Sequence, residues 1–226
     1  MTPQPGSPVN KASIKQERAA KRAKKLEEYH RQQKRVKRNR LIGIVSGAVA
    51  VVAIIALIVT AFVLTPKAAN YAGGGVGDAS TIEGVESFSN TAGHVQTEVA
   101  YEQTPPAGGE HNPAWLNCGV YEQEVPNENA VHSLEHGAVW VTYDPAISDA
   151  ELDLLKEELP SSYVVLSPFE GIPTPIVLSA WNAQLQVDSA DDPRIAEFFT
   201  EFWKSVNVPE NGASCSGAID APGKVS

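Results

Sequence analysis

The sequence predicts an α+β protein: an extracytoplasmic domain with a small sheet and packed helices, preceded by one transmembrane helix and a basic cytoplasmic helix. An apolar run at 41–64 contains no charge and no proline. Charge differs sharply on the two sides of this run, and strand-like and helix-like patterns alternate after it. The predicted parts are a basic cytoplasmic tail at 1–40, a transmembrane helix at 41–64, a linker at 65–81, a globular domain at 82–219 and a flexible tail at 220–226.

The apolar run is long enough to cross a bilayer as a helix. Its 24 residues span about 36 Å at 1.5 Å per residue, and a hydrocarbon core is about 30 Å thick. A cleaved secretory signal has a shorter apolar region of about 7–15 residues. We therefore expect an uncleaved signal anchor that passes once through the plasma membrane.

Charge predicts the orientation of this anchor. Residues 1–40 carry 13 Lys and Arg against 3 Asp and Glu, whereas the remaining chain carries 5 and 24. Because positive flanks stay in the cytoplasm, we expect the N-terminus inside and the acidic domain outside. A basic helix before the membrane is expected to contact anionic lipid. Topology explains the basic run, so we predict no nucleic-acid partner.

The chain has two cysteines, Cys118 and Cys215, both after the apolar run. In an oxidising compartment, one bridge between them is the simplest interpretation. It closes a loop of about 100 residues and contributes about 4–5 kcal/mol in the chain-entropy model. A catalytic or metal-binding thiolate is the alternative, although the chain has no Cys-x-x-Cys motif.

Alternating or β-branched runs indicate the strands of the domain. HVQTEVAY alternates like a half-buried strand, and a loop rich in proline and glycine follows it at 104–118. AVWVTY is typical of a buried strand. The predicted strands lie at 94–101, 138–143, 163–166, 176–181 and 184–187.

Two helices are predicted among these strands. Ser148 is a suitable N-cap for a helix at 149–159, which Pro160 ends. The sequence DDP opens a second helix that extends to about residue 206 and has aromatic residues at helical spacing. Strands and helices in this order indicate a sheet with helices packed on it.

Four histidines are concentrated in the first part of the domain: His94, His111, His132 and His136. In VHSLEHG the last two are four positions apart, which is about 13 Å on a strand but one turn on a helix. The flanks favour a short helix, because nearby asparagines (Asn127 or Asn129) are suitable caps and Gly137 is a suitable end.

We expect this histidine cluster to bind a metal ion, because neutral imidazole is a common ligand. His111 lies in a loop with two glycines that lets it fold over the site, and His94 supplies a further nitrogen. Glu135 has three open roles: a ligand, an acceptor that fixes a histidine tautomer, or a general base. Three or four histidines suit Zn(II) or Cu(II). The predicted metal ligands are His132, His136, His111, His94 and Glu135.

Two other interpretations stay open. Histidine pairs at helical spacing are often structural, which predicts a metal-free interaction subunit that docks on a membrane complex. HSLEH also fits H-x-x-E-H, the inverted zinc-peptidase motif. That motif needs a longer helix than Pro126 and Gly137 allow, and a distant acidic ligand. We therefore do not predict enzymatic turnover, and the peptidase stays an alternative.

One long pattern is familiar: PP-x-x-G-x-H-x-P-x-W-x-x-C-G-x-Y, then V-H-S-L-E-H-G, then P-E…C. It falls here on Pro105, Pro106, Gly109 (or Gly108), His111, Pro113, Trp115, Cys118, Gly119, Tyr121, residues 131–137, Pro209, Glu210 and Cys215. This pattern resembles an actinobacterial membrane-anchored family of unknown function, over about residues 94–215. The resemblance implies the same topology and a bridge between the two cysteines. The resemblance implies no activity. The family pattern does include the VHSLEHG segment and therefore His132, Glu135 and His136.

These observations predict a single-pass membrane protein whose outer domain binds a Zn or Cu ion through the histidine cluster. We expect a metal-handling or accessory role in the cell envelope. The expected partners are membrane lipid and a membrane protein complex.

Overall fold

The computed structural model describes residues 11–64 and 68–226. The first ten residues of the predicted basic tail, and residues 65–67 of the predicted linker, lie outside the described residues. The chain divides into two compact units, the N-terminal helix and the domain that follows it.

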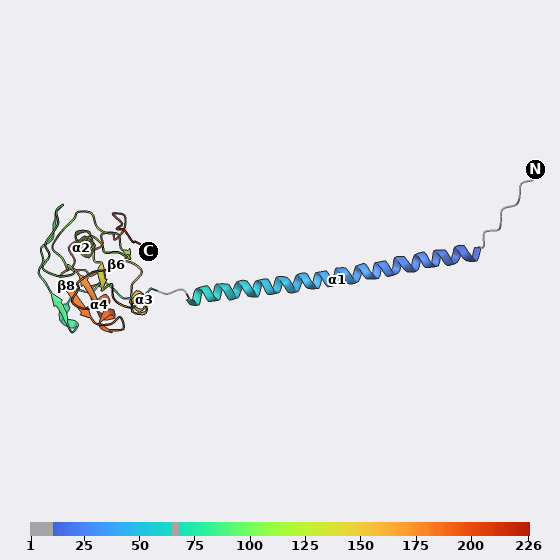
Figure 1. Ribbon diagram of the computed structural model, residues 1–226, viewed down its shortest axis with the longest axis horizontal. Coiled ribbons are helices and arrows are strands. Elements are labelled where there is room, and N and C mark those ends of the chain that lie inside the picture. The colour runs from blue at the N-terminus through green and yellow to red at the C-terminus, as the bar shows by residue number, and fades with distance from the viewer. Residues whose placement is uncertain (1–10, 65–67) are drawn as a thin grey trace, which may run out of the picture. The chain divides into compact units, whose positions relative to one another are not determined.

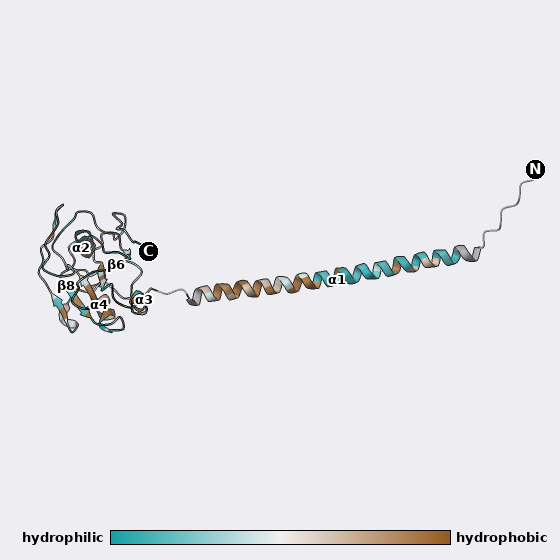
Figure 2. Ribbon diagram, viewed as in Figure 1, coloured by the Kyte–Doolittle hydropathy of each residue, from teal (hydrophilic) through white to brown (hydrophobic). Residues whose placement is uncertain are grey.

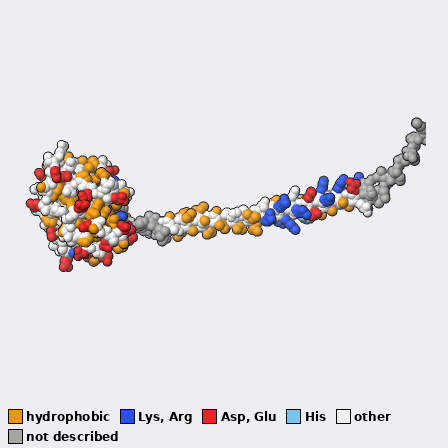
Figure 3. All heavy atoms as spheres, in the orientation of Figure 1, with side chains coloured by type: hydrophobic (Ala, Val, Ile, Leu, Met, Phe, Trp, Pro, Cys, Tyr) orange, Lys and Arg blue, Asp and Glu red, His pale blue; other side chains and the backbone are white. Residues whose placement is uncertain are grey.

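The first unit is one helix, α1 (Lys11–Leu64) (Figure 1). Figure 2 shows that this helix is hydrophilic in its first half and hydrophobic in its second half. Lys and Arg gather along the first half (Figure 3). In the apolar half, the Ser46 and Thr60 hydroxyls donate to carbonyls one turn earlier, which satisfies both side chains within the helix. This helix is long and apolar enough to cross a membrane, as predicted.

The second unit is a mixed α+β domain, which confirms the predicted fold class. Its main sheet has the strand order β1-β8-β7-β5-β6-β4, and a short parallel pair, β2 and β3, lies outside it. In this sheet β5 pairs in parallel with β6 and antiparallel with β7. The strands are β1 (Val85–Ser87), β2 (Gly93–His94), β3 (Glu110–His111), β4 (Gly119–Val120), β5 (Val139–Tyr143), β6 (Val164–Pro168), β7 (Ile176–Ala180) and β8 (Ala183–Val187).

Three central strands, β5, β6 and β7, are buried along their whole length. Their near-continuous apolar sequences fit a sheet that is covered on both faces. Alternate residues of β5 belong to two different hydrophobic clusters: Val139 and Val141 to one, and Trp140 to the other. The sheet therefore separates two cores.

Helices cover both faces of this sheet. The helices α3 (Asp149–Glu157) and α4 (Arg194–Phe202) supply Leu155 and Phe198 to the first core. The helix α2 (Asn127–Glu135) supplies Leu134 to the second core, on the other face. Figure 1 shows α2 and α4 on different sides of β6. The candidate site is built on the α2 side.

The predicted strand at 94–101 is wrong beyond its first residue. Only His94 belongs to β2, which pairs with β3. The Val95 N–H still donates to the His111 carbonyl of β3 over 2.7 Å, but the Val99 N–H donates to the Glu128 carboxylate over 3.0 Å and not to a strand. In this loop Val95, Val99 and Tyr101 are partly buried, and the residues between them are exposed.

Both predicted helices start as expected, α3 ends two residues before its predicted end, and the predicted end of α4 is wrong. The Ser148 hydroxyl caps α3 as predicted, by accepting the Glu151 N–H. The helix α4 ends at Phe202 and not near residue 206, because Trp203 turns to an extended conformation. The Lys204 N–H then donates to the Gly137 carbonyl over 2.8 Å. This bond ties the end of α4 to the turn that closes α2.

Residues next to the predicted domain boundaries also make contacts within the fold. In the segment predicted as a linker, Tyr71 stacks on Phe199 of α4 with ring centroids 4.9 Å apart. In the segment predicted as a flexible tail, the Val225 N–H donates to the Val120 carbonyl over 2.9 Å, and the Val120 N–H donates to Ser226 over 3.0 Å. The last residues therefore extend the edge of the sheet beside β4.

Candidate metal centre

The first five residues of VHSLEHG lie in the second half of α2, a short helix as predicted, and His136 and Gly137 follow it directly. Its N-cap is Pro126, and no side chain caps it, so the prediction that Asn127 or Asn129 is the cap is wrong. Both asparagines lie inside the helix, and the Asn129 amide donates to the Ala114 carbonyl over 2.6 Å. This bond fastens the helix to the loop that follows β3.

Gly137 ends α2 as predicted. Its φ of +94° lies in the left-handed region, which glycine tolerates best. A Cβ at this position would lie 3.2 Å from the Lys204 Cα, so a larger residue would also have to displace the neighbouring backbone slightly. His136 is the C-cap residue with helical φ and ψ, and its ring centroid lies 4.6 Å from that of His132.

The loop after β3 runs along α2 and is bonded to it. The Ser133 hydroxyl donates to the Leu116 carbonyl over 2.7 Å, and the Leu116 N–H donates to the Asn129 carbonyl over 2.9 Å. The register of β2 and β3 places His94 directly opposite His111. Two strands and one helix therefore bring three separate segments to one place.

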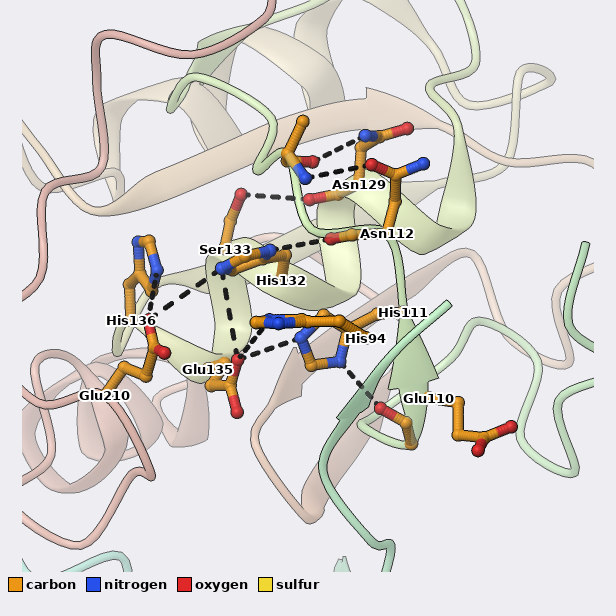
Figure 4. Close-up of polar contacts among 12 residues, drawn as sticks. His94, Glu110, His111, Asn112, Asn129, His132, Ser133, Glu135, His136 and Glu210 are labelled. Carbon is orange, nitrogen blue, oxygen red and sulfur yellow. Dashed lines mark hydrogen bonds and ion pairs between the residues drawn. The ribbon is translucent and has the colours of Figure 1, made fainter. Parts of the chain in front are cut away.

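Two overlapping groups of side chains result, and His132 belongs to both (Figure 4). Within each group, the atoms that could bind a metal all lie within 4.8 Å of one another. The first ligand group is His94, His111, His132 and Glu135. The second ligand group is His132, His136 and Glu210.

Glu135 lies at the centre of the first ligand group. Its Oε2 atom is 2.8 Å from the Nε2 atom of His111 and 3.7 Å from that of His94. The Nε2 atom of His132 lies 4.0 Å from the same oxygen. In the second ligand group, the Glu210 Oε2 atom lies 3.0 Å from Nε2 of His136 and 3.9 Å from Nε2 of His132.

Backbone carbonyls fix the tautomers of the three buried histidines. The Nδ1 atom of His111 lies 2.7 Å from the Gly109 carbonyl, and that of His132 lies 2.7 Å from the Asn112 carbonyl. The Nδ1 atom of His136 lies 2.6 Å from a third carbonyl, at Ser214. A carbonyl only accepts, so each Nδ1 must carry the proton.

The lone pairs on Nε2 then point into the cluster, toward the two carboxylates. In the neutral imidazole this nitrogen only accepts, as a carboxylate does. The pairs His111–Glu135 and His136–Glu210 thus bring two acceptors within 2.8 and 3.0 Å. A proton or a metal ion between them makes such contacts stable. Metal-binding histidines commonly have this arrangement, with the other ring nitrogen held by a carbonyl or carboxylate.

Burial keeps the central imidazole in its neutral form. The pKa of His132 lies below its ordinary value, chiefly because burial penalises the charged ring and also because three other histidines surround it. The hydrogen bond to Asn112 opposes this shift. A neutral imidazole is the form that binds a metal.

The structure brings all five predicted ligands together, but not into a single group. His136 lies in the second ligand group, apart from Glu135. Its carboxylate partner, Glu210, was not predicted as a ligand, although Pro209-Glu210 is part of the long sequence pattern. No spacing rule connects a residue near the C-terminus with a helix 74 positions earlier, so only the fold reveals this contact.

The two cysteines lie beside the second ligand group. Cys118 and Cys215 are at disulfide distance, with Cα atoms 5.4 Å apart. The Cys118 N–H also donates to the Cys215 carbonyl over 2.8 Å. Ser214, whose carbonyl accepts the hydrogen bond from His136 Nδ1, directly precedes Cys215. The cysteine pair therefore holds the C-terminal segment against the loop that borders the site.

Comparison with known proteins gives a family and no activity. No curated protein and no solved structure matches the chain. A model of the family described as "Protein of unknown function (DUF3105)" matches residues 94–217, which include both ligand groups and both cysteines. The chain belongs to this family of unknown function.

Proposed function

We propose that this protein is a single-pass membrane protein whose outer domain binds one Zn(II) or Cu(II) ion at the first ligand group. The observation that carries the proposal is the convergence of imidazole Nε2 atoms on the buried Glu135 carboxylate. We expect the role to be metal handling, or an accessory role in a membrane complex of the cell envelope. Membrane lipid around α1 is the other expected partner.

The donor set supports this choice of ion. Three imidazole nitrogens and one carboxylate oxygen are ligands that Zn(II) and Cu(II) accept in proteins. The rings of His111 and His132 are already oriented by backbone carbonyls, so binding orders few new groups. One divalent ion also supplies the positive charge that the facing acceptors need.

Elemental analysis of the full chain in detergent tests the proposal. After metal removal, incubation with zinc or copper and removal of free ions, we expect about one equivalent bound. His132→Gln should remove the ion, because His132 belongs to both ligand groups. Glu157→Gln, an exposed residue of α3 on the opposite face of the sheet, is the matched control. Less than a tenth of an equivalent on the wild-type chain would favour a metal-free interaction subunit.

A zinc peptidase is the second candidate function, and Glu210 favours it. H-x-x-E-H needs a distant acidic ligand, and Glu210 lies 3.0 Å from His136. Glu135 would then be the general base. We place this candidate second because Glu135 is buried and already bonded to His111. Zinc-dependent cleavage of a broad peptide panel, abolished by Glu135→Gln, would establish it, and no cleavage by the zinc-loaded chain would remove it.

The proposed orientation has its own test. The basic first half of α1 supports a cytoplasmic N-terminus by the positive-inside rule. Protease added outside intact cells should digest the acidic domain and leave the basic segment protected. Digestion of the basic segment alone would reverse the topology.

A further inference from the structure

Building on the proposed function, we infer that the ion has two alternative positions, one in each ligand group, and moves between them around the shared ligand His132. The first position has the ligands His94, His111, His132 and Glu135. The second position has His132, His136 and Glu210. The cluster then accepts a divalent cation and passes it on, and does not hold it permanently.

His132 occupies the midpoint of the cluster. Its Nε2 atom lies 4.0 Å from the Glu135 carboxylate and 3.9 Å from the Glu210 carboxylate (Figure 4). Its Nδ1 atom is bonded to the Asn112 carbonyl, so His132 has a single nitrogen for metal and cannot bridge two ions. One imidazole thus serves two positions, one at a time.

Charge also limits the cluster to one divalent ion. Two divalent ions repel each other four times as strongly as two unit charges at the same separation. The two carboxylates, Glu135 and Glu210, neutralise one divalent ion and leave a second uncompensated in a buried site. The two ligand groups therefore compete for the same ion.

Both ends of the cluster reach the surface. The side chain of His94 is 45% exposed, and that of Glu210 is 44% exposed, whereas His111, His132 and His136 are at most 4% exposed. In a structural zinc site, protein ligands fill all four coordination positions. Each of the two positions thus has one solvent-exposed ligand through which an ion can be exchanged, and buried imidazoles lie between them.

The second position also contains an imidazole that is oriented to receive an ion. The Nδ1 atom of His136 is held by the Ser214 carbonyl, so its Nε2 lone pair points toward Glu210. To move, the ion keeps His132 and exchanges the other ligands of one group for those of the other. The first position offers four ligands and the second three, so the first should hold the ion more tightly.

A double-mutant comparison on the full chain in detergent tests this inference. Affinity for zinc is measured by competition with a chelator, and Glu210→Gln is introduced into two backgrounds. In the wild-type background we expect the smaller loss, about threefold or less, because the ion lies mainly in the first position and Glu210 acts there only as a nearby charge. In His94→Gln/Glu135→Gln, where the first position is dismantled, we expect a loss of about tenfold or more. Glu157→Gln in both backgrounds is the control.

The outcomes separate the two proposals. If Glu210→Gln lowers zinc affinity equally in both backgrounds, the second position is wrong, although the proposal that the protein binds metal is unaffected. No zinc on the wild-type chain would remove the proposed function itself. If His94→Gln/Glu135→Gln does not fold, His94→Gln alone, an exposed substitution, serves as the background. The loss of zinc affinity caused by Glu210→Gln should then be about twofold larger in the His94→Gln background than in the wild-type background, because three ligands remain at each position. Equal losses in the two backgrounds would again overturn the inference.

Discussion

The Nε2 atom of His111 lies 2.8 Å from the Oε2 atom of Glu135, and neither side chain is more than 5% exposed. The other nitrogen of this imidazole is committed to the Gly109 carbonyl. A buried carboxylate against an imidazole lone pair requires a positive charge between them. A proton or a metal ion between the two acceptors would supply that charge, and the described His/Glu group could hold a metal ion.

Metal should stabilise the folded domain. An ion that binds only the native state at a hundred times its Kd adds about 2.7 kcal/mol to the free energy of unfolding. Urea denaturation in zinc and in chelator should show this difference for the wild-type chain. The difference between zinc and chelator should vanish in His132→Gln. An equal difference in this variant would show that the ion binds elsewhere.

Without metal, the contribution of His132 to stability should decrease below about pH 6.5, the ordinary pKa of histidine. The folded state lowers the pKa of His132, so at mildly acidic pH the unfolded chain binds a proton that the folded chain does not. Stability then falls as pH decreases from 6.5 toward the folded pKa, by at most about 1.4 kcal/mol per pH unit. Urea midpoints in chelator at pH 7.5 and 5.5 should differ more for the wild type than for His132→Gln. A larger decrease of the urea midpoint from pH 7.5 to pH 5.5 in His132→Gln than in the wild type would contradict this prediction.

Removal of the cysteine pair should weaken both the fold and the second ligand group. The cysteines are 97 positions apart, and a bridge over such a loop contributes about 4–5 kcal/mol in the chain-entropy model. Cys118→Ser/Cys215→Ser should lower the urea midpoint accordingly. Alkylation of the wild-type chain without reductant should find both thiols blocked, and a reactive Cys118 would argue against the bridge.

Gly137→Ala should destabilise the domain and disturb the metal centre together. A left-handed conformation costs a residue with a Cβ about 1–2 kcal/mol, and the added Cβ meets the Lys204 Cα at 3.2 Å. Gly171→Ala is a matched control, because Gly171 also has positive φ but has no atom within 4 Å of its ideal Cβ. We expect a lower thermal midpoint in Gly137→Ala than in Gly171→Ala, and weaker zinc binding in Gly137→Ala alone. Equal midpoints would show that close packing at Gly137 is not needed.

Local patterns predicted the parts of this protein that depend on neighbours in the chain. The apolar run before residue 65, the buried strand AVWVTY, the Ser148 cap and the Gly137 stop each depend on a few consecutive residues. The strand predicted at 94–101 failed for the same reason. Alternating exposure occurs in a loop as well as in a strand, and a strand needs a partner that the pattern does not reveal.

The histidines were recognisable as a cluster in the sequence, but their division into two groups was not. Helical spacing placed His132 and His136 together correctly. Glu210 reaches them only because the chain after α4 returns to the end of α2, where the Lys204 N–H bonds to Gly137. Residue types and short spacings thus indicated that these side chains can bind a metal. Which atoms face one another was decided by the sheet register, the backbone carbonyls and long-range contacts, because these join segments that no local pattern connects.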